Sequence, residues 1–330
     1  MAFHRRGRQD LVRTRIILIP MRKRLSILLI LALCSSIPVF ALSSFFELSA
    51  GGGWSSLGYG LDNSSQPVLN ASQKGSYGFN AHVGYGLQFT RHIGVGFGAD
   101  FARYGANAQL GGQAQWKEVM DTDGEEYNHI TVVHRWTDQQ ELYMLEIPLA
   151  LYLRFPVATD VRMYGAVGVK ACIPLMKKAS FSGSIAHQGF YEPWMMTITD
   201  IPNHGFYTAS MEGKYDLQTA KYTIGAFLKF GVEAPVDELR RVWIFGAISA
   251  SMQFMEAIRK APATPIGWRN DTPDENMRQA HYFMSDYSAI IHSSLLTGHI
   301  WPIAVGAEIG IRFRIPHPKR YHSHCRCEEE

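Results

Sequence analysis

One histidine and one aspartate stand at positions suited to acid–base chemistry. Alternating apolar and polar residues flank the short segment 90–92, and aligning the apolar faces across this turn sets His82 directly opposite Asp100. An imidazole oriented by a carboxylate can act as a general base. The sequence places no nucleophilic serine beside the pair. We therefore interpret it as a structural pair, predict no catalytic residue, and expect the protein not to be an enzyme.

Ten charged residues share the polar faces of alternating segments, five of each sign. A buried charge is costly unless it is paired, so equal numbers in a narrow interior indicate a neutralised network rather than a ring of one sign. A small gated pore for ions or solutes is the alternative. Together with His82, this predicted network comprises Glu47, Asp100, Glu146, Glu233, Glu308, Arg154, Arg162, Lys170, Lys229 and Arg312.

The C-terminal tail carries the side chains of a thiolate and imidazole metal site, namely His322, His324, Cys325 and Cys327. These residues are crowded, follow two prolines and run into three glutamates. We therefore interpret 316–330 as a solvated periplasmic tail and predict no bound metal and no cofactor.

Eight segments of strict period-two alternation must position the charged residues. Successive side chains of a strand point to opposite faces, so this period predicts β-strands. Their ranges are 46–54, 77–89, 93–101, 143–155, 161–173, 222–232, 242–254 and 301–313.

The connections between these segments alternate in length. Three are short, at 90–92, 156–160 and 235–240, whereas four are long and polar, at 58–75, 105–140, 175–220 and 256–299. Short turns at one end and long loops at the other are typical of a bacterial transmembrane barrel. Both chain ends then lie on the short-turn, periplasmic side.

The two faces favour a membrane barrel over a soluble barrel or sandwich. The polar faces are rich in glycine, as a narrow eight-stranded interior requires wherever a large side chain points inward. The apolar faces end in aromatic residues, which suits the two girdles of a membrane barrel. This predicted girdle comprises Phe46, Trp54, Tyr77, Phe89, Phe101, Tyr143, Phe155, Tyr222, Phe254, Trp301 and Phe313.

Composition excludes several other classes. The 330 residues are 46% hydrophobic and 12% aromatic, which excludes a disordered chain. A mean hydropathy of −0.09 excludes a polytopic helical membrane protein. The formal charge of +3 arises in residues 1–41, which carry +7, so the remaining chain carries −4 and offers no basic surface for nucleic acid.

The N-terminal segment has the three parts of a secretory signal peptide. Basic residues at 21–24 precede an apolar run at 25–33 and a cleavage site at 39–41. A retained anchor and a lipoprotein signal at Cys34 are alternatives, and translation starts at Met1 or Met21. We predict an N-terminal extension and signal peptide over 1–41, a barrel over 42–315 and a tail over 316–330.

Two motifs resemble a known family. Leu-Glu-Ile-Pro-Leu at 145–149 and Tyr-Gly-Ala-Val-Gly-Val-Lys at 164–170 resemble paired strands of the small Gram-negative outer membrane proteins with a β-barrel domain, often called porin-like. Residues 308–315 resemble the terminal-strand signal read by the barrel assembly machinery. The resemblance implies an all-β fold: an eight-stranded antiparallel up-and-down transmembrane barrel of OmpA type, embedded in outer membrane lipid.

The expected role is structural, or surface binding through the loops 105–140, 175–220 and 256–299. Aromatic and methionine residues in otherwise polar loops can anchor an extracellular ligand. An accessory role in an envelope secretion or assembly machine is a further alternative. The candidate anchors are Trp116, Phe190, Tyr191, Trp194, Met195 and Met196.

Overall fold

A computed structural model describes most of the chain beyond the predicted signal peptide. The described residues are 43–61, 69–121, 123–217, 222–254, 266–268, 285–287, 290, 296–297 and 299–316. The predicted signal peptide, most of the predicted tail with its histidines and cysteines, and most of the loop 256–299 lie outside them. Among the described residues, no helix reaches the length and apolarity of a membrane span.

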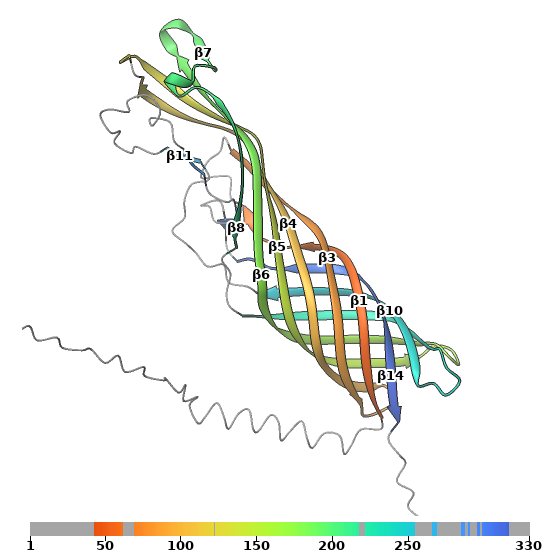
Figure 1. Ribbon diagram of the computed structural model, residues 1–330. Helices are drawn as coiled ribbons and strands as arrows, with labels where there is room; N and C mark the ends of the chain where they lie inside the picture. Colours follow the sequence, from red (N-terminus) through yellow and green to blue (C-terminus); the bar gives the residue numbers. More distant parts are fainter. Residues whose placement is uncertain are drawn as a thin grey trace, which may run out of the picture. The chain divides into compact units, whose positions relative to one another are not determined.

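Eight long strands form one closed antiparallel sheet (Figure 1). Each pairs with the next along the chain, and the last pairs with the first, so the ring has no open edge. This confirms the predicted up-and-down barrel. The eight strands are β1 (Ser43–Ser56), β3 (Leu69–Gln88), β4 (Ile93–Met120), β5 (Glu126–Pro156), β6 (Arg162–Tyr191), β9 (Thr223–Pro235), β10 (Val242–Phe254) and β14 (Ile303–Pro316).

Short elements complete the described fold. Strand β2 (Gly60–Leu61) pairs with β13 (Leu296–Thr297), and β11 (Ile266–Trp268) pairs with β12 (Ser285–Tyr287). Strands β7 (Met196–Ile198) and β8 (Thr208–Asp216) pair with the outer part of β6. The 3-10 helix η2 (Glu192–Trp194) lies between β6 and β7 in sequence, and η3 (Pro202–His204) lies between β7 and β8.

The barrel carries its apolar side chains on the outside. In β9, Leu228 is 57% exposed and Phe230 51%, whereas the intervening Lys229 is only 9% exposed. The same alternation of exposed apolar and buried polar residues recurs around the ring. A soluble barrel has the opposite arrangement, so the outer surface of this ring suits lipid and its interior holds the polar groups.

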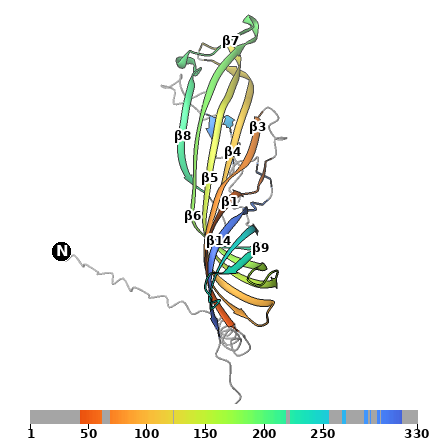
Figure 2. The same cartoon turned by 90° about the vertical axis from the view of Figure 1, so that its right-hand side faces the viewer.

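Three strands continue far beyond the ring. Strands β4, β5 and β6 have 28, 31 and 30 residues, compared with 13 in β9 and β10. Their outer parts, with β7 and β8, form a curved sheet that we call the arm (Figure 2). The stretches 105–140 and 175–220, expected to be loops, are therefore mostly strand. Pairing satisfies the backbone N–H and C=O groups that a long loop would leave to water.

Candidate functional site in the lumen and on the arm

Arg312 of β14 carries a buried guanidinium in the half of the lumen nearest the short turns. Its Nη2 and Nε donate hydrogen bonds to Oε2 of Glu47 at 2.7 and 3.0 Å, and its Nη1 donates to Glu233. Its guanidinium carbon lies between 4.8 and 5.5 Å from the ring centres of Phe45, Tyr152, Tyr164 and Phe245. Charge-assisted bonds and ring faces thus hold one cation in place. We call this arrangement the arginine plug.

Glycines make room for the rings of the plug. A Cβ added to Gly86 would collide with the ring of Phe45, and one added to Gly310 would collide with the ring of Phe245. The glycine-rich inner faces predicted from the sequence therefore serve the close approach of large inward side chains. The lumen is packed with aromatic rings as well as small residues.

Separate ion pairs cross the middle of the lumen. Lys170 Nζ lies 2.6 Å from Glu146, and Lys229 Nζ lies 2.9 Å from Glu308. His82 Nδ1 bonds Asp100, its partner in the β3–β4 register. These residues are all buried, at most 9% exposed. Pairing between inward side chains of different strands thus compensates the charges, as burial requires.

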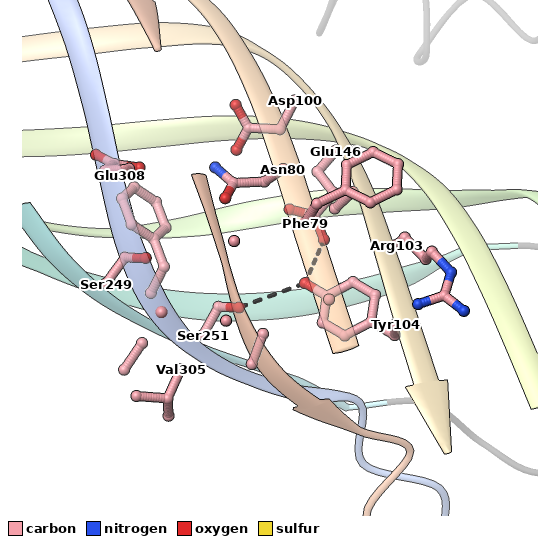
Figure 3. A pocket seen from close by; sticks show the side chains of 18 of the residues that line it. Phe79, Asn80, Asp100, Arg103, Tyr104, Glu146, Ser249, Ser251, Val305 and Glu308 are labelled. Atoms are coloured by element: carbon pink, nitrogen blue, oxygen red, sulfur yellow. Dashed lines mark hydrogen bonds between the residues drawn. The ribbon is translucent and has the colours of Figure 1, made fainter. Parts of the chain in front are cut away.

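A cavity of about 50 Å³ lies among these pairs, large enough for a few water molecules (Figure 3). Tyr104 projects toward it and donates to Glu146 at 2.7 Å, with Ser251 at 3.3 Å on its other side. Asp100 and Glu308 also line it. The lining carries acidic and basic groups in equal number, so the cavity suits water. Ser49 of β1 stands opposite His82 in the register, but among the described residues no serine is hydrogen-bonded to the His82–Asp100 pair.

Most of the predicted network occupies the lumen, with two differences. Arg162 is half-buried at the turn-side end, and its guanidinium carbon lies 4.3 Å from the ring centre of Trp243 without an ion pair among the described residues. Arg314 lies beside the same ring at 5.2 Å and was not in the predicted set. The sequence pattern could have indicated this position, because Arg314 is two residues from Arg312 and therefore lies on the same inward face of the strand.

All eleven residues of the predicted girdle have side chains that are at least partly exposed on the outside of the ring. Tyr222 is the most exposed, at 78%, while Phe89, Phe101 and Tyr143 are intermediate. Girdle residues at the end of the ring nearest the arm contact one another across strands. The ring centres of Phe101 and Tyr143, for example, are 6.0 Å apart. Their assignment as a lipid-interface girdle stays a prediction.

The end of the arm has a small aromatic core of its own. The ring centre of Tyr127 lies 5.3 Å from those of both Tyr191 and Phe206, and all three residues are buried. Beyond them the chain turns through η2, where Trp194 stacks on Tyr191 at 5.2 Å yet remains 53% exposed. The packing of these aromatic rings holds the exposed segment that follows Tyr191 in a defined position.

The exposed end consists of three consecutive apolar residues of the predicted anchor set. Met195 is 80% exposed and Met196 47%, next to Trp194. Met195 also has a left-handed backbone, with φ at 49°. This conformation costs a residue other than glycine about 1 to 2 kcal/mol. We call Trp194, Met195 and Met196 the arm tip.

Two buried histidines lie behind the tip. His129 Nε2 and His187 Nδ1 are 3.2 Å apart, and the hydroxyl of Thr131 lies 3.3 and 3.2 Å from these atoms. Desolvation lowers the pKa of His129 to about 3, with a further contribution from His187. Desolvation also lowers the pKa of His187 to about 4. Both rings are therefore neutral at pH 7.

One acidic turn of the arm has side chains of the kind that bind metals. Ligand atoms of Asp121, Asp123 and His204 all lie within 4.8 Å of one another. Asp121 already accepts hydrogen bonds from the Tyr191 hydroxyl and from the backbone of Asp123 and Glu125. These bonds account for the acidic cluster as part of the turn.

A closed ring with an apolar exterior and a charged, filled interior defines a membrane-spanning β-barrel protein. The outer membrane protein beta-barrel domain family matches residues 27–244, more than half of the chain. The protein belongs to this family, and its place is the outer membrane of a Gram-negative bacterium, in contact with lipid.

Comparison with solved structures finds other outer membrane proteins at low similarity. OprG from Pseudomonas aeruginosa is 11% identical, with 84% of this chain and 98% of that chain covered and a TM-score of 0.33. Neisserial surface protein A is 10% identical, with coverages of 82% and 96% and a TM-score of 0.30. Ail from Yersinia pestis is 11% identical, with coverages of 82% and 99% and a TM-score of 0.27. No curated protein sequence matches the chain.

Proposed function

We propose that this protein is a surface-binding, non-enzymatic outer membrane protein whose barrel anchors an outward-pointing arm. In this arrangement the short turns and both chain ends face the periplasm, and the arm projects from the cell. The barrel assembly machinery inserts the chain. The observation that carries the proposal is the exposed Trp194–Met196 tip at the end of a sheet that continues from the barrel.

The composition and geometry of the tip support binding to a partner. Trp and Met are enriched where proteins contact partners, and exposed aromatic side chains often act as anchors. The left-handed backbone of Met195 is strained without contributing to the buried core. Strain retained at an exposed apolar position is typical of a functional site. The partner that fits this tip is a protein surface with an apolar depression.

The lumen supports an anchoring role rather than transport. Arg312, Glu47 and Glu233 are at most 3% exposed, so the side chains of the arginine plug are shielded from water and occupy the lumen at their level. The channel alternative requires these ion pairs to separate. Stepwise conductance of the unmodified protein in a planar bilayer would therefore favour the channel over the anchor.

Cysteine labelling on intact cells tests the orientation. Met195→Cys and Val236→Cys are introduced separately after Cys325 and Cys327 are changed to serine. Position 236 is 62% exposed in the turn between β9 and β10, at the opposite end of the barrel. A membrane-impermeant maleimide should label position 195 on intact cells and position 236 only after permeabilisation. The reverse pattern would contradict the proposed orientation.

Photocrosslinking on living cells tests binding. A photoreactive residue at position 194 should give a discrete adduct, whereas the same residue at Gln139, exposed on the shaft of the arm, should not. Met195→Gly serves as the matched variant, because glycine relieves the left-handed strain and removes the apolar side chain. It should leave folding intact or improved and weaken the adduct from position 194. Equal adducts from 194 and 139 would refute the tip as the binding surface.

A further inference from the structure

The end of the barrel nearest the short turns holds an unusual concentration of arginines. A pocket of about 460 Å³ opens there. Its basic lining residues come from the β3–β4 turn, β5, β6 and β14, and its described lining includes no acidic side chain. We call it the turn-side pocket, and its basic residues are Arg91, His92, Arg154, Arg162 and Arg314.

Arg154 is the most informative of these residues. It is only 1% exposed, and no described residue accepts a hydrogen bond from its Nε or either Nη atom. Glu233 Oε1 lies 3.4 Å from its Nε, longer than a charge-assisted hydrogen bond, and the other oxygen of Glu233 is bound to Arg312. A buried guanidinium without acceptors is costly, so this position calls for an acceptor that the described residues do not supply.

The local charges do not balance. Four guanidinium groups, those of Arg154, Arg162, Arg312 and Arg314, lie near two carboxylates, Glu47 and Glu233, and both carboxylates bind Arg312.

Two acids of the neighbouring turns are engaged elsewhere, and the third, Glu238, is exposed and does not line the pocket. Asp160 bonds Arg240 at 2.7 Å, and Asp237 accepts the backbone N–H groups of Arg241 and Val242. The excess positive charge of the turn-side pocket therefore remains uncompensated by the described residues.

Aromatic contacts hold the arginines in place. Arg162 and Arg314 both lie against the ring of Trp243, whose Nε1 donates to the carbonyl of Arg240 at 2.8 Å. Arg154 lies 4.5 Å from the ring centre of Phe45. Stacked guanidinium groups keep their N–H donors free and preorganised for an incoming anion.

We propose that the turn-side pocket binds a phosphate group. Three guanidinium groups from three different strands converge on it, which suits a tetrahedral anion with several acceptor oxygens better than a carboxylate, which one arginine binds bidentately. The phosphate comes either from a soluble phosphate compound or from the headgroup of a phospholipid in the adjoining leaflet. This inference is independent of the arm, which lies at the other end of the barrel.

Titration of the full chain in detergent micelles with inorganic phosphate and with glycerol phosphate, followed by calorimetry and ³¹P NMR, tests the site. Saturable binding is expected, with acetate at least about tenfold weaker. Arg314→Gln and Arg162→Gln should each weaken phosphate binding at least about tenfold, because each removes a charge-assisted contact. Both residues lie outside the arginine plug, so folding is expected to survive. Arg241→Gln, an exposed turn arginine outside the pocket lining, is the control.

Native mass spectrometry from phospholipid nanodiscs distinguishes the two sources of phosphate. Retention of phospholipid by the unmodified chain and its loss in Arg314→Gln identify a headgroup, whereas binding of the soluble phosphates alone identifies a soluble ligand. Either result supports a phosphate site. Absence of saturable binding in both experiments, or equal affinity in Arg314→Gln and Arg241→Gln, would overturn the proposal.

Discussion

Acidification should loosen the outer part of the arm while leaving the barrel intact. His129 and His187 are 0% and 1% exposed and have pKa values lowered to about 3 and about 4, compared with about 6.5 in an unfolded chain. Protons therefore bind the unfolded arm more strongly than the folded arm. The stability contributed by neutral burial is complete above pH 6.5 and is lost as the pH falls from 6.5 toward these lowered values.

The magnitude follows from the shifts. At pH 5 the preference of protons for the unfolded state costs about 2 kcal/mol for each histidine, or about 4 kcal/mol for the pair, relative to pH 7.5. Local opening of the arm should then become roughly a thousandfold more frequent.

Hydrogen exchange of the full chain in nanodiscs measures this opening, after correction for the intrinsic pH dependence of exchange. Amides of 127–131 and 185–191 should lose protection at pH 5, whereas amides of β9 in the ring should not. Replacing both His129 and His187 with glutamine should remove most of the pH dependence. His134→Gln, at an exposed position of the same strand, should not. Unchanged arm protection between pH 7.5 and 5 would refute the reasoning.

Three further predictions concern the barrel. Arg312→Met leaves the carboxylates of Glu47 and Glu233 buried without the cation that binds them both. The substitution should therefore destabilise the barrel by about 3 to 5 kcal/mol, measured as a lower temperature for the mobility shift on denaturing gels. Gly86→Leu should prevent formation of the heat-modifiable form because its side chain meets Phe45, whereas Gly246→Leu, where an added Cβ meets nothing within 4 Å, should fold. The unmodified protein should be silent in a planar bilayer, and any Arg312→Met protein that folds should conduct if the plug closes the lumen.

The alternation of apolar and polar residues predicts the eight strands of the ring well, because contact with lipid on one face requires that alternation. A strand between lipid and a packed lumen cannot slip by one residue without exposing polar groups to lipid. The inward position of Arg312 and the pairing of His82 with Asp100 follow from this parity. Parity is less informative where both faces are apolar, and so the inward rings of Trp243 and Phe245 in β10 were not foreseen.

The arm could not be predicted in the same way, because its strands lose phase. The β4–β5 register shifts between Leu110 and Gly112 and again between Trp116 and Val119. The β5–β6 register shifts between Val133 and Thr137. A bulge inserts an extra residue and reverses the faces that follow, so a strictly alternating pattern breaks into short pieces that resemble a polar loop. The histidine pair joins residues 58 positions apart on the outer side of such a shift, and no local pattern indicates it.

The unbroken course of β5 from the bilayer to the end of the arm determines how far the protein reaches. From Tyr143, a member of the predicted girdle, to Glu126 the strand takes seventeen steps, a contour length of about 55 Å at about 3.3 Å per residue. That length exceeds the thickness of a lipid headgroup layer several times over. In the proposed orientation, a partner that binds Trp194 would therefore lie well outside the headgroup layer of the cell's own bilayer.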